Sequence, residues 1–343
     1  MASIFSFLFG RSGRFSSTKK YETKQKKEKE SYLRFIEDSM SDIVSRYAEL
    51  DALIHSESYK IKVNELKKEK LYSQSEEKKY LDEFTKLQKN KEIKWYLETL
   101  KQKDFKEQKE WALTFEDDFN EQQLDSSKWM TGYFWGKTLM NDFYVLAGEK
   151  QFYADSNISI NHGSVCLTTK EEKVKGKAWD PAIGFKDREF DYSSALISTG
   201  QSFRQKYGKF EAKIKFRGKY PVVNAFWMLG EKMLPQIDVF KTSKLKGNEL
   251  ESGIHTIIDK KAATLLTTIL DIAFYSQYFI YSLEWSEQAL IWKINGTEVH
   301  RETKNIPDEP MYLTFCITLP DIPKSGQLPA VMEIDWVRCY KKV

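Results

Sequence analysis

The sequence changes character near residue 111, and this change limits what each part of the chain can fold into. Residues 18–110 contain neither proline nor glycine and are dominated by Lys, Glu and Gln. Residues 111–343 carry short aromatic and β-branched runs that are broken by Gly, Asn, Asp and Pro. The first composition favours helices, and the second is typical of an antiparallel β-sandwich. We therefore expect an apolar tail at 1–17, a charged helical region at 18–110 and a β domain at 111–343.

The helical region has an amphipathic pattern. Apolar side chains recur in steps of three and four residues from Tyr32 to Ile54. The spacing predicts one stripe along a helix, about three heptads long, which is near the lower limit for a coiled coil. A second charged run follows, with its stronger apolar positions between Leu81 and Leu100. Helices this polar must pack as a hairpin, on the β domain or against other subunits, so we expect an assembly role with protein partners or self-association through residues 18–110.

The β domain contains one clear hairpin and one strand with unusual chemistry. Asn295-Gly296 separates two alternating runs and suits a type I′ turn. In the run Gln236-Ile-Asp-Val-Phe-Lys241, Gln236 and Asp238 lie two residues apart and so project from one face. A bulge after Val239 would bring Lys241 back to that face. One surface would then carry an amide, a carboxylate and an ammonium group.

This run resembles the catalytic strand Glu-x-Asp-x-x-Glu of glycoside hydrolase family 16, the laminarinase and β-glucanase family. The resemblance covers about residues 111–343 in order, and it includes Leu113–Phe119, Tyr207–Lys213, Ala225–Leu229 and Met332–Tyr340. It implies a mainly β fold, a two-sheet antiparallel jelly roll of the concanavalin A-like type, with a cleft on its concave face.

The same resemblance places the family's nucleophile at Gln236, its tuning Asp at Asp238 and its acid/base at Lys241. A retaining glycosidase needs two carboxyl groups about 5–5.5 Å apart. An amide cannot form the glycosyl ester, and a lysine of pKa about 10.4 is a poor proton donor at neutral pH. We therefore expect no catalytic residues here, but a glucanase-like domain that binds a polysaccharide or a protein partner. The alternative is an active endo-acting hydrolase.

Such an enzyme would need a non-standard acid, for which Glu231, Glu249 and Glu251 are the nearby candidates in the sequence.

Further candidate ligand-binding residues are Trp135, Trp179, Trp227 and His255. Trp227 precedes the site strand, whereas Trp135 and Trp179 fall in runs that we expect to be loops at the rim of the cleft. An indole can stack on the apolar face of a sugar, but a Trp in a strand belongs to the core at least as often. A lone histidine is more often structural than functional. Asp238 could likewise pair with Lys241 without any ligand.

Several classes of function are disfavoured. The formal charge of +4 is small and mixed in sign, so nucleic acid is not expected. Three cysteines argue against a disulfide framework, and the four histidines lack metal-ligand spacing, so we expect no metal site and no cofactor. The resemblance allows a structural calcium ion, for which we assign no ligands. No apolar run approaches the roughly 20 residues of a transmembrane helix.

The N-terminus carries the apolar run 4–9, followed by Arg11 and Arg14. A secretory signal has its positive charge before the apolar run, so we expect no such signal and synthesis in the cytoplasm. The run either docks on a protein or membrane or packs on its own helices. Sugar-binding domains of the family act outside the cell. A particle that carries the protein out, such as a phage virion, is one hypothesis that reconciles these two points.

Overall fold

The computed structural model describes residues 15–140, 142–242, 249–270, 274–275 and 277–343, and it forms two compact units. Residues 22–110 form a helical unit. Residues 111–343, together with the N-terminal residues up to Tyr21, form a β unit. The expected apolar run 4–9 lies outside the described residues.

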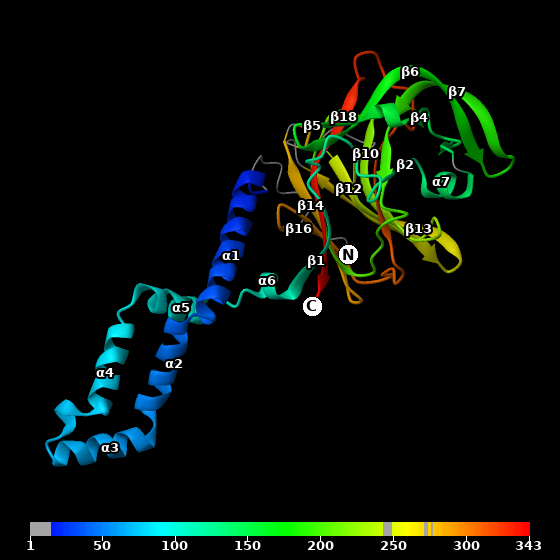
Figure 1. Cartoon of the computed structure of the whole chain (residues 1–343). Helices are drawn as coiled ribbons and strands as arrows, with labels where there is room; N and C mark the ends of the chain where they lie inside the picture. Colours follow the sequence, from blue (N-terminus) through cyan, green and yellow to red (C-terminus); the bar gives the residue numbers. More distant parts are fainter. Residues whose placement is uncertain (1–14, 141, 243–248, 271–273, 276) are drawn as a thin grey trace. The chain divides into compact units, whose positions relative to one another are not determined.

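The helical unit consists of consecutive helices joined by short connections (Figure 1). Its elements are α1 (Thr18–Ser39), α2 (Asp42–His55), α3 (Glu57–Lys68), η2 (Tyr72–Gln74), α4 (Glu76–Leu87), α5 (Lys91–Gln102) and α6 (Lys106–Glu110). The prediction of one continuous stripe from Tyr32 to Ile54 was wrong. The side chain of Ser41 accepts a hydrogen bond from Val44 N and starts a new helix, so the two halves of the stripe belong to α1 and α2.

The helices of this unit pack on one another. The rings of Tyr47 and Phe84 stack with centroids 5.1 Å apart, which joins α2 to α4. Phe35 and Tyr96 stack at 5.2 Å and join α1 to α5. Of the three packing alternatives that the sequence left open, packing among the unit's own helices is therefore present.

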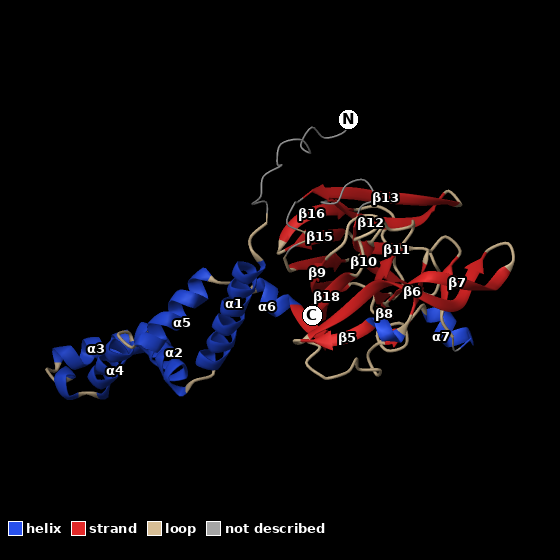
Figure 2. Cartoon of the chain, turned by 90° about the horizontal axis from the view of Figure 1, so that it is seen from above, coloured by secondary structure: helices blue, strands red, loops and turns tan. Residues whose placement is uncertain are grey.

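The β unit is a jelly roll of two sheets, as the sequence predicted (Figures 1 and 2). Sheet I has the order β16-β15-β14-β9-β18-β6-β7-β4, with β1, β3 and β5 paired beside it. Its strands are β1 (Trp111–Asp117), β3 (Tyr144–Leu146), β4 (Gln151–Tyr153), β5 (Ile158–Asn161), β6 (Ser164–Asp180), β7 (Gly184–Ser194), β9 (Gly208–Phe216), β14 (Phe279–Trp285), β15 (Leu290–Ile294), β16 (Thr297–Glu302) and β18 (Ala330–Lys342).

Sheet II has the order β13-β12-β11-β10-β17-β8-β2. Its strands are β2 (Met130–Thr131), β8 (Leu196–Ser198), β10 (Val223–Leu229), β11 (Gln236–Thr242), β12 (Glu249–Ile258), β13 (Lys261–Leu270) and β17 (Tyr312–Thr318). Apolar side chains from both sheets fill the space between them, with Phe226 stacked on Phe315 at 4.4 Å and Phe240 against Tyr281 at 4.3 Å. Every second residue of a strand points to the other face, which leaves one outer face on each sheet.

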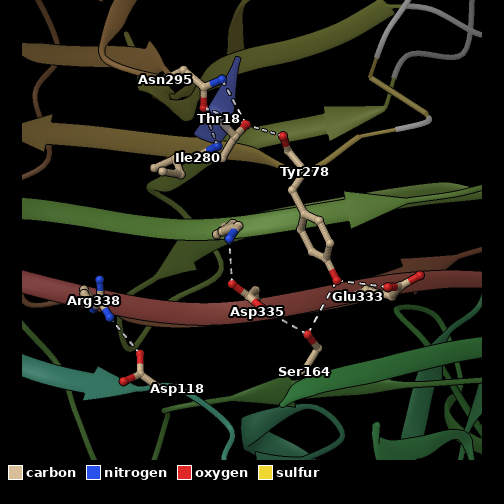
Figure 3. A network of polar contacts seen from close by, with 10 residues as sticks. Thr18, Asp118, Ser164, Tyr278, Ile280, Asn295, Glu333, Asp335 and Arg338 are labelled. Atoms are coloured by element: carbon tan, nitrogen blue, oxygen red, sulfur yellow. Dashed lines mark hydrogen bonds and ion pairs between the residues drawn. The ribbon is translucent and has the colours of Figure 1, made fainter. Parts of the chain in front are cut away.

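The predicted hairpin turn is confirmed and has a further role. Asn295 and Gly296 both have positive φ angles, 46° and 76°, as a type I′ turn requires. The side-chain amide of Asn295 also donates to the carbonyl oxygen of Ser16 at 2.8 Å. The Thr18 hydroxyl donates to the carbonyl oxygen of Tyr278 (Figure 3). The first described residues therefore belong to the jelly roll, a contact that the sequence did not indicate.

The outer face of sheet I is covered by charges that neutralise one another. Lys213 pairs with Asp335 at 2.9 Å, and Lys215 pairs with Glu333 at 2.6 Å. The Tyr278 hydroxyl donates to Glu333 at 2.9 Å (Figure 3). Because β9 contributes the lysines and β18 the carboxylates, these pairs tie neighbouring strands together. These charged side chains are therefore paired with one another. The candidate site lies on the other sheet.

Part of the chain folds over the outer face of sheet II, and we call this part the cap. It comprises Tyr133, α7 (Phe134–Met140), β3, β4 and the hairpin of β6 and β7. The parallel pairings of β3 with β6 and of β4 with β7 join its pieces. Its aromatic side chains form a second apolar cluster with residues of β8, β10 and β17. The cap therefore determines which half of the outer face of sheet II is accessible.

Candidate functional site

The candidate site is built around a bulge in β11. Trp227 and Phe226 are consecutive on β10, yet they pair with Asp238 and Phe240, so Val239 is the extra residue. The pairing with β12 shifts at the same place. Val239 and Phe240 are both buried in the core between the sheets. The bulge that the sequence suggested is therefore present, and it places Gln236, Asp238 and Lys241 together on the outer face of sheet II.

The bulge is held in place from the opposite sheet. The carbonyl oxygen of Asp238 accepts a hydrogen bond of 2.9 Å from the indole N–H of Trp292, a buried residue of β15. A bulge disrupts the local ladder of backbone hydrogen bonds, so its polar groups need other partners. Trp292 was not predicted from the sequence, because nothing local connects it to β11.

Asp238 is a fully buried carboxylate at the centre of the site. Its Oδ1 accepts from the amide of Gln236 at 2.5 Å, and its Oδ2 accepts from Nε2 of His255 at 2.9 Å. Burial acts to raise the pKa of Asp238, but the hydrogen bond from His255 and the positive charge of Lys241 outweigh it. The pKa of Asp238 therefore lies below its ordinary value, and the group is ionised at neutral pH.

His255 lies between Asp238 and the edge of the sheet. An ionised carboxylate has no proton to donate, so Nε2 of His255 carries the proton of their hydrogen bond. The other ring nitrogen, Nδ1, is 3.0 Å from the hydroxyl of Thr264 on β13. Both ring nitrogens are thus engaged by the protein. The structure places His255 next to Asp238 and gives it the role of fixing that carboxylate.

The cross-strand registers arrange the outer face of sheet II in three rows. From β13 toward β8 they are Thr264–His255–Gln236–Leu229–Tyr312, then Leu266–Gly253–Asp238–Trp227–Thr314–Ser198, and finally Thr268–Glu251–Lys241–Ala225–Cys316–Leu196. Every residue of these rows on β10, β17 and β8 is buried. The residues on β13 are exposed, and Gln236, Lys241, Glu251 and His255 are partly exposed. The accessible site therefore spans β11, β12 and β13.

Trp227 lies on the covered side of this boundary. Only 8% of it is exposed, and its indole N–H points at the sulfur of Cys316 at 3.3 Å. It packs in the cluster beneath the cap. Of the two roles that the sequence allowed for this residue, the structure shows it in the core.

Trp135 and Trp179 were expected in loops, and that expectation was wrong. Trp135 belongs to α7, and Trp179 belongs to β6, where it pairs with Leu146 of β3. Both are partly buried against the cluster beneath the cap. Their sequence neighbours Gly136 and Pro181 suggested turns, but the contacts of the cap decide the local structure. The indole N–H of Trp135 donates to the carbonyl oxygen of Glu231, in the loop before β11, at 3.3 Å.

A buried carboxylate inside the cap was not singled out by sequence reasoning. Glu149 accepts hydrogen bonds from Leu146 N at 2.7 Å and from the hydroxyls of Tyr153 at 3.0 Å and Tyr133 at 3.1 Å. The amide of Gln151 donates to it at 3.1 Å. Burial raises the pKa of Glu149, against the lowering effect of these donors. The network joins the start of α7 to β3 and β4, and so it supports the cap.

The three acids considered for a hydrolase lie in different surroundings. Glu231 is in the loop before β11 and pairs with Arg204. Glu249 is buried, with only 5% exposed. Glu251 is partly exposed and stands opposite Lys241 in the β11–β12 pairing. Of the three, the registers place Glu251 beside Lys241.

The described part of the chain contains no group of three or more His, Cys, Asp or Glu side chains that could hold a metal ion. Within the same ranges, no helix has the length and apolar character needed to cross a membrane.

The fold and the bulged strand define a glycosidase-type jelly roll, and comparison with known proteins identifies its family. The model for "Glycosyl hydrolases family 16" matches residues 139–338. This is more than half of the chain, and the chain belongs to that family.

The relatives found by sequence comparison are longer than the matched part of this chain, and several are named as glycan-cleaving enzymes. Residues of this chain are 25% identical over 250 positions to an endo-1,3-1,4-beta-glycanase, ExsH, of Rhizobium meliloti, covering 66% of this chain and 51% of that protein. A glucan endo-1,3-beta-glucosidase A1 of Niallia circulans is 27% identical over 271 residues, covering 67% of this chain and 38% of that protein. The chain thus spans about half or less of these relatives.

Among solved structures, the laminarinase catalytic domain of Thermotoga maritima MSB8 superposes with a TM-score of 0.56 at 22% identity, covering 68% of this chain and 99% of that domain. The kappa-carrageenase of Pseudoalteromonas carrageenovora gives 0.56 at 21% identity, covering 68% and 96%. These likenesses support the fold of the jelly-roll unit.

Proposed function

We propose that the jelly roll binds β-glucan chains without cleaving them. The observation that carries this proposal is the state of the three outer-face positions on β11. They hold an amide, a buried carboxylate with both oxygens engaged, and an ammonium group. A retaining glycosidase needs one carboxylate free to attack and a second carboxyl group to protonate the leaving oxygen. Asp238 is fully buried, so it supplies neither.

The same positions are suited to binding. The Oε1 atom of Gln236 and the ammonium of Lys241 make no hydrogen bond or ion pair with another described residue. One is an acceptor and the other a donor, and both are partly exposed. Sugar hydroxyls can satisfy both groups. The β-glucan class is favoured because one similar protein is named a glucan endo-1,3-beta-glucosidase and another is named an endo-1,3-1,4-beta-glycanase.

Two assays run side by side test this proposal. Isothermal titration calorimetry with a linear β-1,3-glucan oligosaccharide should show binding, and a reducing-end assay on the same mixture should show no new ends. Gln236→Ala and Lys241→Ala should weaken binding, whereas Arg301→Ala, which changes an exposed cation on sheet I, should not. Enzyme-like release of reducing ends would favour the hydrolase alternative, and loss of that activity in Glu251→Gln would identify its acid.

For the helical unit we propose self-association. Leu33, Met40, Ile61 and Leu100 are each more than half exposed, which is unusual for large apolar side chains on one small unit. We also propose that the helical unit attaches the protein to a particle such as a phage virion. The mass of the full chain measured by light scattering should exceed that of a monomer, and it should fall to the monomer value in Leu33→Glu/Met40→Glu.

A further inference from the structure

The accessible part of the site is open on one side and closed on the other. β13 is the edge strand of sheet II, and Thr264, Leu266 and Thr268 are exposed along it. At β10, three strands away, the outer face disappears beneath the cap. With neighbouring strands about 4.8 Å apart, the open region from β11 to β13 is only about 10 Å wide.

Contacts between the cap and the loop before β11 fix the closed side. The indole of Trp135 donates to the carbonyl oxygen of Glu231, and the carboxylate of Glu231 pairs with Arg204. The guanidinium of Arg204 lies 4.7 Å from the ring centre of Phe134 and 5.1 Å from that of Tyr312. Arg204 also donates to the carbonyl oxygen of Gly200 at 3.0 and 3.1 Å. The loop is therefore attached to the cap and to sheet II at once.

The polar groups available to a ligand lie next to this closed side. Gln236 and Lys241 stand on β11, directly before the covered strand β10. In the middle row the surface becomes less polar toward β13, since Gly253 contributes no side chain and Leu266 is 37% exposed. A saccharide could lay its apolar face over Leu266 and direct its hydroxyls to Gln236 and Lys241.

We infer that the site holds the end of a β-glucan chain and not its interior; this rests on the proposed function above. The chain enters over β13, and its terminal sugar meets Gln236 and Lys241 at the closed side. A terminal sugar has a hydroxyl that an interior sugar uses in the next glycosidic bond. An interior segment laid across the strands would have to continue over β10, where the outer-face residues are buried beneath the cap, and it would leave the terminal contacts unmade.

The test compares linear and cyclic glucans with the full-length protein. A cyclic β-1,3-glucan has no ends, so calorimetry should show at least about tenfold weaker binding than for a linear β-1,3-glucan oligosaccharide of similar size, a difference of about 1.4 kcal/mol. Equal affinity for the two would overturn the inference while leaving glucan binding intact. If neither glucan binds, the proposed function itself fails, so the two failures are distinguishable.

Variants on the closed side give an independent test. Trp135→Phe keeps an aromatic ring but removes the hydrogen bond to the Glu231 carbonyl, and Arg204→Ala removes the ion pair to the same residue. Each variant should reduce the difference in binding affinity between the linear and the cyclic glucan. Arg301→Ala is the control, and its affinities should stay as in the wild type. If Arg204→Ala does not fold, the conservative Trp135→Phe carries the comparison. If a folded Trp135→Phe/Arg204→Ala variant kept the full preference for the linear glucan, the closed side would not be the cause of that preference.

Discussion

The contact between His255 and Asp238 allows a quantitative prediction. In His255→Ala, the Asp238 carboxylate stays fully buried and loses the donor on Oδ2. A hydrogen bond to a charged group contributes about 1.5–3 kcal/mol. Because Gln236 and Lys241 remain, we expect a loss of about 2–3 kcal/mol in the free energy of unfolding at pH 7. This leaves the domain folded if its stability is in the usual range of about 5–15 kcal/mol.

The effect should depend on pH in a defined direction. The pKa of Asp238 is lowered in the folded protein, so its contribution to stability is present above the unfolded value of about 3.9 and is lost as the pH falls through the folded value. Removing His255 raises the folded pKa toward the unfolded one. Once the pH is below the folded pKa of Asp238 in both proteins, this carboxyl group is protonated, and the difference in stability between wild type and His255→Ala should disappear.

Urea unfolding followed by tryptophan fluorescence measures this, because all tryptophans except Trp95 lie in the jelly-roll unit. Thr264→Val is the matched control: it removes the other partner of His255 at an exposed position and should cost less than about 1 kcal/mol. A His255→Ala protein within about 0.5 kcal/mol of wild type at pH 7, or a difference that persists below the folded pKa of Asp238, would refute the assigned hydrogen bond to this buried charge.

Three further predictions concern the strand, the cap and the N-terminal contact. Gln236→Glu/Lys241→Glu should gain measurable release of reducing ends from β-1,3-glucan, since it restores two carboxyl groups on the bulged strand; no release from a folded variant would mean that the shape of the site has also diverged. Glu149→Gln should lower the free energy of unfolding by about 1–3 kcal/mol, because its amide nitrogen would face either Leu146 N–H or the donors on the other oxygen; an unchanged urea midpoint would argue against that network. Asn295→Asp keeps the acceptor for Ile280 N but loses the donor to Ser16 O, and calorimetry should show a cost of about 1–2 kcal/mol that an N-terminal deletion of residues 1–18 abolishes.

The sequence determined the elements whose signals are local. The absence of glycine and proline from residues 18–110 predicted helices. The short aromatic and β-branched runs broken by turn residues after residue 110 predicted the jelly roll. Asn295-Gly296 predicted a turn that needs two positive φ angles. The run Gln236–Lys241 predicted a strand with three polar groups on one face, and the bulge at Val239 makes that arrangement possible. Each of these features depends on backbone preferences over a few residues.

Tertiary contacts decided the rest. Nothing near Asp238 in the sequence shows that Trp292 holds its carbonyl or that His255 holds its carboxylate, since these partners are 54 and 17 residues away. Trp135 and Trp227 both lie in aromatic runs of the sequence, yet Trp227 is buried beneath the cap, whereas the indole of Trp135 is bonded to the loop before β11. The stripe from Tyr32 to Ile54 continued in the sequence through the point where Ser41 starts a new helix. Periodicity records which face of an element is apolar, but only packing between distant segments determines what covers that face and which groups remain accessible.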